Sequence, residues 1–371
     1  MNETKLNIPT LSVGEITDIL SETFVTAIKK GVSPKLIPSV MLWGPPGVGK
    51  SQAVRQIAKE VERQTGKQAK VTDVRLLLFN PIDLRGIPTA NADKTLAIWL
   101  KPQIFQMDAS DNIVNILFLD EISAAPQSVQ AAAYQITLDR VVGEHKLPDN
   151  CIVIAAGNRV TDKSVSFKMP KALANRLLHL EVEGSYESWN NWAVKTGINE
   201  KVLGYLASHT GRLFGFNPAN DDLAFATPRS WEMVSNLLNN VNSDVKKMYP
   251  MIAGLVGTGT AIEFMSWMNV FDKVPKMEDV FNGVAQIKPT TIDVLYATVS
   301  AMSVYAKDVK NDVVKIGNSL EYAKNFPSDF RALLVTNYKA FSVDYEDFLK
   351  SVPQYYNLVR ESGVLRNGSV D

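Results

Sequence analysis

A glycine-rich stretch early in the chain carries the residue types that hold a phosphate chain. The stretch reads Gly44, Pro45, Pro46, Gly47, Val48, Gly49, Lys50 and Ser51. It completes the pattern G-x-x-x-x-G-K-[ST] without a mismatch, and its glycines allow backbone N–H groups to surround a triphosphate. We expect all of these residues to bind the nucleotide, with Lys50 as a point charge on the β- and γ-phosphates and the Ser51 hydroxyl as a Mg²⁺ ligand. The alternative is an ordinary Gly-Pro turn before a helix.

Two acidic residues follow an apolar stretch further along the chain. Residues 113–119 are typical of a parallel strand covered on both faces, and Asp120 and Glu121 come directly after them. Open α/β sheets bind ligands at the carboxyl ends of their strands. We therefore predict that Asp120 holds Mg²⁺, directly or through water, and that Glu121 orients and deprotonates the attacking water. The alternative interpretation is a charged loop start.

Asn158 ends another apolar stretch. It follows residues 152–156 through Gly157. At a strand end its amide is placed to contact the γ-phosphate or the attacking water. A Gly-Asn pair alone is an ordinary turn, so this assignment depends on the two earlier motifs.

Strands and helices must bring these residues to one edge of a sheet. Residues 38–43 are predicted to be a buried strand before the glycine loop, and residues 52–61 have the apolar spacing of a helix after it. A capping box from Ser12 to Glu15 predicts an amphipathic helix that ends near Gly31. Pro126 is expected at the first position of another helix.

The remaining elements of this region are less regular. Residues 80–88 are predicted to be loop, because prolines and a glycine interrupt them. Strands or hairpin arms are predicted over residues 71–79, 95–100, 141–147 and 151–156. The alternation of strand and helix from residue 38 to 182 predicts a doubly wound parallel sheet. After residue 184 the spacing is helical, so we predict an α/β nucleotide-binding domain over 1–184 and a helical region over 185–371.

The composition excludes several classes of protein. Lysine plus arginine equals aspartate plus glutamate, at 39 each, so no global basic excess indicates nucleic acid. The single cysteine, Cys151, excludes an internal disulfide and fits a reducing cytosol. No signal pattern and no apolar run of membrane-spanning length is present. We expect a soluble cytoplasmic protein without membrane insertion.

Several motifs together resemble those of an AAA+ ATPase, and of its MoxR branch in particular. In chain order they cover residues 44–51, 116–122, 155–158, 173–176 and 226–229. The Pro-Pro pair in the loop, residues 125–133 and the hairpin before Asn158 are similar to the MoxR branch. The resemblance extends from residue 35 to about residue 240. It implies an AAA+ core with a parallel sheet between helices, an all-α lid with a helical C-terminal extension, and ATP and Mg²⁺ as cofactors.

The resemblance also implies roles for Asn158 and for two arginines. Asn158 matches sensor 1, Arg176 matches the arginine finger that reaches a neighbouring subunit's site, and Arg229 matches sensor 2 in the lid. A guanidinium group keeps its proton and can spread its donors over developing phosphate charge. Structural salt bridges are the alternative role for both arginines. Arg140 and Arg159 are additional interface candidates without an assigned role.

The implied function is Mg²⁺-dependent ATP hydrolysis that remodels, assembles or activates a client protein. The implied assembly is a homo-oligomeric ring, a hexamer, working with a partner that bears a von Willebrand factor A domain. Residues 108–112 depart from that domain's D-x-S-x-S motif at Asn112, so the partner would be another polypeptide. Two alternatives stay open, namely an AAA+ motor or loader on nucleic acid and a nucleotide-gated scaffold with little turnover.

Overall fold

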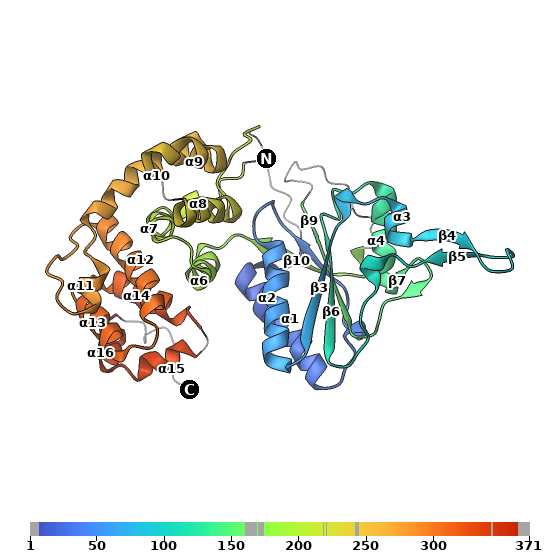
Figure 1. Ribbon diagram of the computed structural model, residues 1–371, viewed down its shortest axis with the longest axis horizontal. Coiled ribbons are helices and arrows are strands. Elements are labelled where there is room, and N and C mark those ends of the chain that lie inside the picture. The colour runs from blue at the N-terminus through green and yellow to red at the C-terminus, as the bar shows by residue number, and fades with distance from the viewer. Residues whose placement is uncertain are drawn as a thin grey trace. The chain divides into compact units, whose positions relative to one another are not determined.

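The computed structural model describes residues 7–159, 169, 174–217, 219, 221–241, 245–342 and 344–362. The chain divides into two compact units (Figure 1). The first spans Met1–Ser185 with Asn217–Asn220, and the second spans Tyr186–Phe216 with Asp221–Asp371. The first is an α/β unit and the second is helical.

A parallel sheet forms the centre of the α/β unit. Its strands lie in the order β1 (Thr10–Ser12), β10 (Leu178–Glu183), β2 (Val40–Trp43), β9 (Cys151–Gly157), β6 (Ile113–Asp120) and β3 (Gln68–Arg75). All neighbouring pairs in this sheet are parallel. Strands β6 and β9 are buried along almost their whole length, which explains their continuous apolar sequences. The predicted doubly wound parallel sheet is confirmed.

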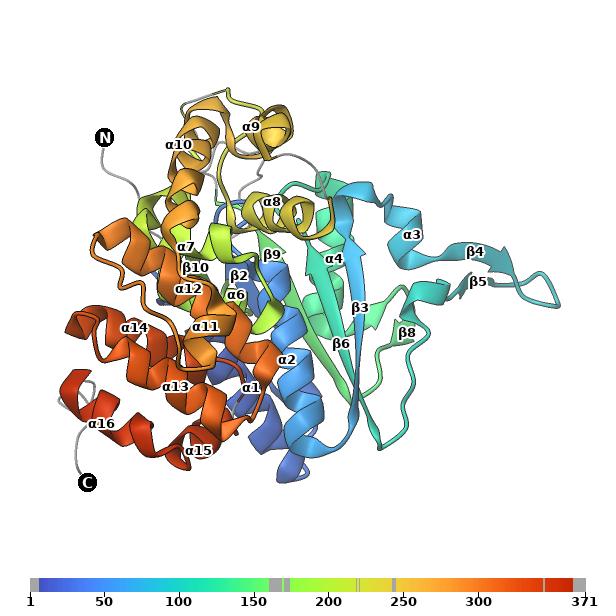
Figure 2. The same ribbon diagram turned by 60° about the vertical axis from the view of Figure 1, so that its left-hand side comes forward.

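Helices cover both faces of this sheet. Helices α1 (Val13–Lys29) and α2 (Lys50–Thr65) pack together on one face, and α4 (Gln127–Asp139) covers the other (Figures 1 and 2). The predicted capping box of α1 is present, since Ser12 Oγ accepts a hydrogen bond from the Glu15 N–H and the Glu15 carboxylate accepts one from the Ser12 N–H. Pro126 is the residue before α4 rather than its first residue.

The segment predicted as loop over residues 80–88 is partly regular. It contains the short helix α3 (Pro81–Arg85) and the start of strand β4 (Ile87–Ala90), so the loop prediction was wrong. Asn80 and Asp83 form a capping box around Pro81, and this local signal outweighs the helix-breaking residues at either end. The strand predicted over 71–79 is shifted, because β3 ends at Arg75 and Leu76–Leu78 form a 3-10 turn.

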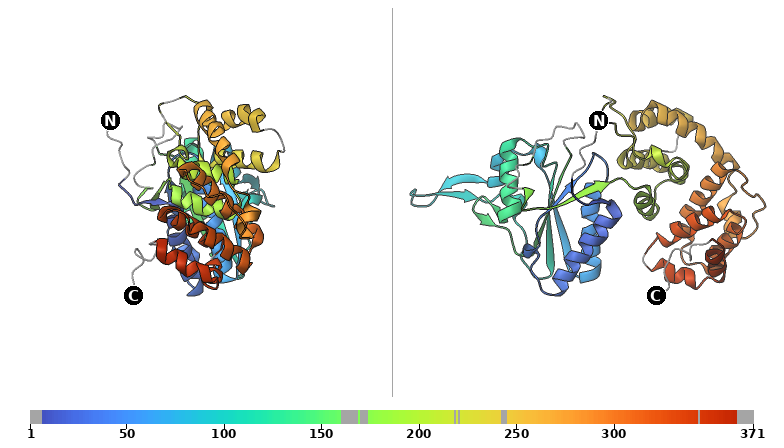
Figure 3. Two further views of the ribbon diagram at one scale, coloured as in Figure 1. Left: turned by 90° about the vertical axis from the view of Figure 1, so that its left-hand side faces the viewer. Right: turned by 180° about the vertical axis from the view of Figure 1, so that it is seen from behind.

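Two antiparallel hairpins extend the α/β unit. Strand β4 pairs with β5 (Ala97–Leu100) in a ribbon that projects from the unit (Figure 3, right). The second hairpin, β7 (Val141–Val142) with β8 (His145–Lys146), confirms the one predicted over 141–147. It braces the ribbon's base, since a ring nitrogen of His145 lies 2.8 Å from the carbonyl oxygen of Trp99. At Gly143 a Cβ atom would lie 2.5 Å from the Arg85 carbonyl oxygen.

The second unit consists of helices, as the spacing after residue 184 predicted. Its helices are α6 (Tyr186–Thr196), α7 (Glu200–Ser208), α8 (Pro228–Asn240), α9 (Tyr249–Val256), α10 (Thr258–Met268), α11 (Met277–Phe281), α12 (Ile292–Val309), α13 (Val313–Ala323), α14 (Ser328–Lys339), α15 (Tyr345–Lys350) and α16 (Pro353–Ser362). An aromatic cluster of Tyr205, Trp231 and Phe264 joins α7, α8 and α10. Among the described residues, no helix has the length and apolar character needed to cross a membrane.

Candidate nucleotide-binding site

The glycine loop lies at the carboxyl end of β2, between β9 and β10. Helix α2 begins at Lys50, which confirms the predicted order of strand, loop and helix. Gly47 and Gly49 have φ angles of 76° and 109°, which side chains rarely adopt. At Gly44 a Cβ atom would lie 2.8 Å from the carbonyl oxygen of Val182 on β10. These glycines allow the loop to fold tightly at the amino end of α2, where backbone N–H groups favour an anion.

The ammonium group of Lys50 lies inside this loop. Its Nζ donates to the carbonyl oxygens of Gly44 at 2.6 Å and Pro45 at 2.9 Å. It also donates to Oδ1 of Asn158 at 3.0 Å. Only 8% of Lys50 is exposed, so the charge acts where water screens it little. Two predicted site residues, 108 positions apart in the sequence, therefore meet beside the loop.

Ser51 and Asp120 form the second pair. The Ser51 hydroxyl donates to Oδ2 of Asp120 at 2.9 Å, and Oδ1 of Asp120 accepts the Glu121 N–H at 2.9 Å. A hydroxyl and a carboxylate oxygen at this separation supply the oxygen ligands that Mg²⁺ prefers. Mg²⁺ usually takes one or two protein carboxylates and completes its shell with phosphate and water. The pair therefore fits a magnesium–nucleotide complex.

Glu121 follows Asp120 in an uncommon backbone conformation. Its φ angle is 59°, in the left-handed region, where a non-glycine residue is strained by an energy on the order of 1 kcal/mol. Within the described parts of the chain, its carboxylate forms no hydrogen bond or ion pair, and the side chain is half-buried. The carboxylate is therefore free of other partners there and can accept a proton from water.

Ser123 supports Asn158 and was missed by the sequence reasoning. Its hydroxyl oxygen accepts the Asn158 N–H at 2.8 Å, and only 2% of the residue is exposed. At Gly157 a Cβ atom would lie 2.9 Å from both this oxygen and Cε of Met41, so a glycine is needed for the close approach. The only signal in the sequence for a role of Ser123 was its position two residues after Glu121.

The structure does not bring Arg176 to its own glycine loop. Arg176 lies in the turn before β10, and Leu178 at the start of β10 pairs with Val40 at the start of β2. Because the strands are parallel, Arg176 is at the amino-terminal edge of the sheet and the loop is at the opposite edge. Its side chain is exposed and pairs with no residue in the described ranges. Leu173, the first residue of its motif, lies outside those ranges.

Arg229 belongs to the helical unit. It occupies the first turn of α8, after the N-cap Thr227, and its side chain is exposed. It forms no ion pair with the residues that the structure describes. Arg229 is therefore a surface residue of the helical unit, and its contact with nucleotide stays a prediction.

Arg140 and Arg159, the additional interface candidates, make contacts inside the α/β unit. The Arg140 guanidinium donates to the carbonyl oxygens of Cys151 and Ile37, both at 2.9 Å. Burial lowers the pKa of this guanidinium from its usual value. Arg159 forms an ion pair with Glu181 at 2.6 Å. Arg140 is 7% exposed, so it is not available to a neighbouring subunit.

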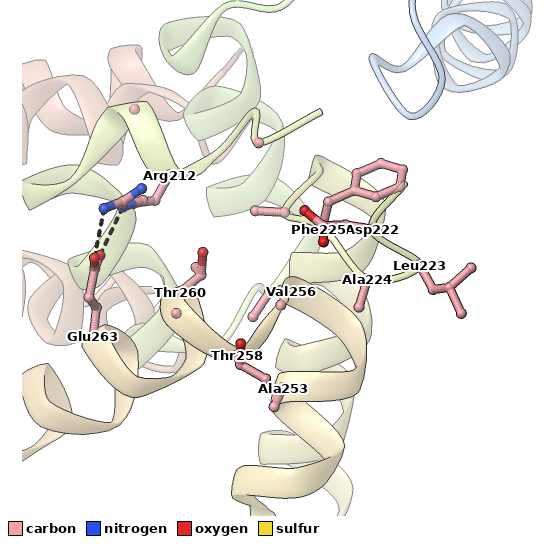
Figure 4. A pocket seen from close by; sticks show the side chains of 15 residues that line it. Arg212, Asp222, Leu223, Ala224, Phe225, Ala253, Val256, Thr258, Thr260 and Glu263 are labelled. Atoms are coloured by element: carbon pink, nitrogen blue, oxygen red, sulfur yellow. Dashed lines mark hydrogen bonds and ion pairs between the residues drawn. The ribbon is translucent and has the colours of Figure 1, made fainter. Parts of the chain in front are cut away.

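A cavity of about 490 Å³ lies within the helical unit, and the sequence did not indicate it (Figure 4). Phe225 and Ala226, in the segment before α8, line it together with the start of α10 at Thr258. An ion pair between Arg212 and Glu263, with atoms 2.7 Å apart, lies on its wall. None of its lining residues belongs to the glycine loop, and none is a predicted site residue.

Comparisons with known proteins place the glycine loop in a recognised domain. Residues 40–180 match the family described as "ATPase family associated with various cellular activities (AAA)". No curated protein matches the chain in sequence.

Solved structures with a related fold are distant. A RuvB mutant from Thermotoga maritima is 17% identical, with a TM-score of 0.38, over 80% of this chain and 83% of its own. A putative ATPase from Cytophaga hutchinsonii is 15% identical, with a TM-score of 0.33, over 97% of this chain and 92% of its own. NtrX from Brucella abortus is 14% identical, with a TM-score of 0.34, over 94% of this chain and 67% of its own.

Proposed function

We propose that this chain, whose residues 40–180 match the AAA ATPase family, hydrolyses ATP with the help of Mg²⁺. The observation that carries the proposal is the meeting of residues from three strand ends. Lys50 contacts Asn158 at 3.0 Å, and Ser51 contacts Asp120 at 2.9 Å. One edge of the sheet thus holds a cation for the phosphates (Lys50), oxygen ligands for a metal (Ser51 and Asp120) and a carboxylate that can act on water (Glu121).

Each side chain then has a definite task. Lys50 holds the β- and γ-phosphates, and Ser51 and Asp120 hold Mg²⁺, which neutralises phosphate charge when bound. Glu121 accepts a proton from the water whose oxygen attacks the γ-phosphorus, and the bridging oxygen leaves with ADP. Asn158 orients the water or the γ-phosphate. Arg229 contacts the nucleotide from the helical lid of the same subunit.

Glu121→Gln tests the catalytic assignment. An amide of the same shape cannot accept the proton, so we expect kcat to fall by about 10²-fold or more. Affinity for ATP, measured with a fluorescent analogue, should change little, because Lys50 and Ser51 are intact. Lys50→Met is the matched variant that should lose binding. If the unaltered protein binds ATP without measurable phosphate release, the nucleotide-gated scaffold is the correct alternative.

We propose further that the protein acts as a homo-oligomeric ring, a hexamer, in which Arg176 completes the neighbour's site. Support comes from the exposure of Arg176 and its place at the sheet edge away from its own loop. Arg176→Ala and Glu121→Gln subunits should each be inactive alone. In a random mixture, about one interface in four of a head-to-tail ring holds both intact residues, so activity should return. Mixed rings that stay inactive, despite shown co-assembly, would refute action in trans.

The work of hydrolysis is proposed to be the remodelling or activation of a client protein in the cytoplasm, together with a separate von Willebrand factor A partner. The β4–β5 ribbon supports a protein client, because Ile87, Ile98 and Leu100 are 61%, 42% and 54% exposed on it. A two-stranded ribbon alone cannot bury such side chains. Glu121→Gln protein held in ATP should retain a client that the same protein with Ile98→Ser and Leu100→Ser releases. Equal retention by both proteins would remove the ribbon from client binding.

A further inference from the structure

A tryptophan and a histidine form a hydrogen-bonded pair beside the glycine loop. Trp43 Nε1 lies 2.9 Å from Nδ1 of His179, and the two ring planes differ by 18° with centroids 6.1 Å apart. The indole N–H can only donate, so Nδ1 of His179 is the acceptor and carries no proton. The other ring nitrogen, Nε2, lies 2.7 Å from the carbonyl oxygen of Ala174 and donates to it. The contacts therefore fix both the tautomer and the orientation of the ring.

The histidine ring connects two functional segments. Trp43 is the last residue of β2 and directly precedes Gly44, the first residue of the glycine loop. Ala174 begins the turn that contains Arg176, and the same carbonyl oxygen also accepts the Leu177 N–H at 3.2 Å. The two segments lie at different edges of the sheet, and His179 spans the distance with one side chain.

We propose that His179 is a positioning residue that holds the turn carrying Arg176 in register with the glycine loop of the same subunit. The proposal rests on the function given above, in which Arg176 acts on the neighbouring subunit's nucleotide. The imidazole of His179 contacts Trp43 beside the glycine loop and Ala174 beside Arg176. It therefore joins the loop that binds this subunit's nucleotide to the arginine that acts on the neighbouring subunit's nucleotide. The position of Arg176 at the neighbour's nucleotide thus depends on the geometry of the glycine loop in the subunit that supplies this arginine.

Two conservative variants separate the two hydrogen bonds of His179. In His179→Gln the amide nitrogen can replace Nε2 and donate to the Ala174 carbonyl, while in His179→Asn the amide oxygen can replace Nδ1 and accept from Trp43. We expect His179→Asn to lower kcat by about 10²-fold with KM for ATP nearly unchanged, because a small misplacement of a catalytic group has that effect. His179→Gln, which loses the hydrogen bond from Trp43, should lower kcat in the same way, because the link to the glycine loop is then broken. A kcat that stays near the wild-type value in either variant, or a rise in KM for ATP alone, would contradict the proposal.

Mixed assemblies distinguish action on the neighbour's site from action on the same subunit's loop. If His179 positions Arg176, His179→Asn subunits resemble Arg176→Ala subunits. They should then regain activity with Glu121→Gln subunits and stay inactive with Arg176→Ala subunits. If His179 only shapes its own loop, the pattern reverses, because the defective loop belongs to the same site as Glu121. This reversed pattern would overturn the proposal.

The mixture of Arg176→Ala with Glu121→Gln serves as the reference. If it fails to recover activity in co-assembled rings, the ring function proposed above is wrong, and the positioning of a finger in trans falls with it. If it recovers while His179→Asn fails with Glu121→Gln, only the role of His179 is refuted. Thermal unfolding of His179→Gln and His179→Asn, followed by circular dichroism, controls for loss of the fold. Unfolding temperatures that match that of the unaltered protein, together with a lower kcat, support positioning over a purely structural role.

Discussion

Gly157 is a residue at which the structure leaves no room for a side chain beside the candidate site. In Gly157→Ala the new methyl group would lie 2.9 Å from Ser123 Oγ, the oxygen that holds the Asn158 backbone. We expect kcat for ATP to fall at least tenfold while ATP affinity stays within about twofold, because Asn158 is displaced and the glycine loop is not. Gly254→Ala is the control, since no atom lies within 4 Å of that added carbon. Wild-type hydrolysis in Gly157→Ala would exclude Ser123 as a support for Asn158.

Cys151 is the only cysteine and is 1% exposed, so its thiol reports on the opening of the α/β unit. Burial raises the pKa of this thiol to about 11. The reactive thiolate is therefore scarce below that pH in the folded protein, and labelling by a thiol reagent at pH 8 should be slow. We expect the labelling rate to rise as pH approaches 11 and to rise steeply when urea unfolds the unit. Fast labelling of the folded protein at pH 8 would contradict this burial.

At the level of elements, Arg140 joins the end of α4 to the amino ends of β2 and β9, the neighbouring strands that carry parts of the candidate site at their carboxyl ends. Its guanidinium satisfies the carbonyl oxygens of Ile37, just before β2, and Cys151, at the start of β9. Arg140→Met should lower the free energy of unfolding by about 2 kcal/mol, because one buried and one partly buried carbonyl group lose their donor. Urea unfolding followed by Cys151 labelling measures this change. Arg63→Ala, at an exposed pair with Glu60, should change it by less than about 0.5 kcal/mol.

The sequence predicted the elements whose local residue pattern has a single cause, such as burial or helix capping. Strands β6 and β9 are apolar because both their faces are buried, and α1 carries its own capping box. Strand β10 was not predicted, although its apolar residues alternate with His179, Glu181 and Glu183, which is the usual pattern of a strand with one covered face. Two of these polar residues have partners far away in the chain, as the Glu181 contact with Thr10 shows. Hydrogen bonds between residues so far apart in the chain cannot be recognised from the neighbouring sequence.

The candidate site follows the same division. Lys50, Ser51, Asp120 and Asn158 were expected together because they occupy a spaced motif or a strand end, and the structure brings them into contact. Ser123 and His179 belong to no motif. Their contacts with Asn158 and Trp43 join segments that are distant in sequence, and periodicity and spacing cannot reveal such contacts.

For the whole molecule, the balance of charge bears on the choice between a protein client and nucleic acid. The chain has 39 basic and 39 acidic residues, so it lacks the general excess of positive charge that attracts phosphate backbones. We expect duplex and single-stranded DNA to change the rate of ATP hydrolysis by less than about twofold at low salt. Stimulation by DNA that falls steeply as salt increases would favour the nucleic-acid motor. Hydrolysis that responds to neither DNA nor salt leaves the protein client as the better hypothesis.

The contact between the two hairpins connects the β4–β5 ribbon mechanically to the rest of the α/β unit. A ribbon fixed at one end behaves as a cantilever, and the bending moment from a pull on its tip is greatest at the base. At that base His145 touches the Trp99 carbonyl and Gly143 faces Arg85. Both contacts belong to the segment that leads into β9, at whose far end Asn158 meets Lys50. Part of any tension on the ribbon would therefore pass into the segment before β9, the strand that ends beside the glycine loop.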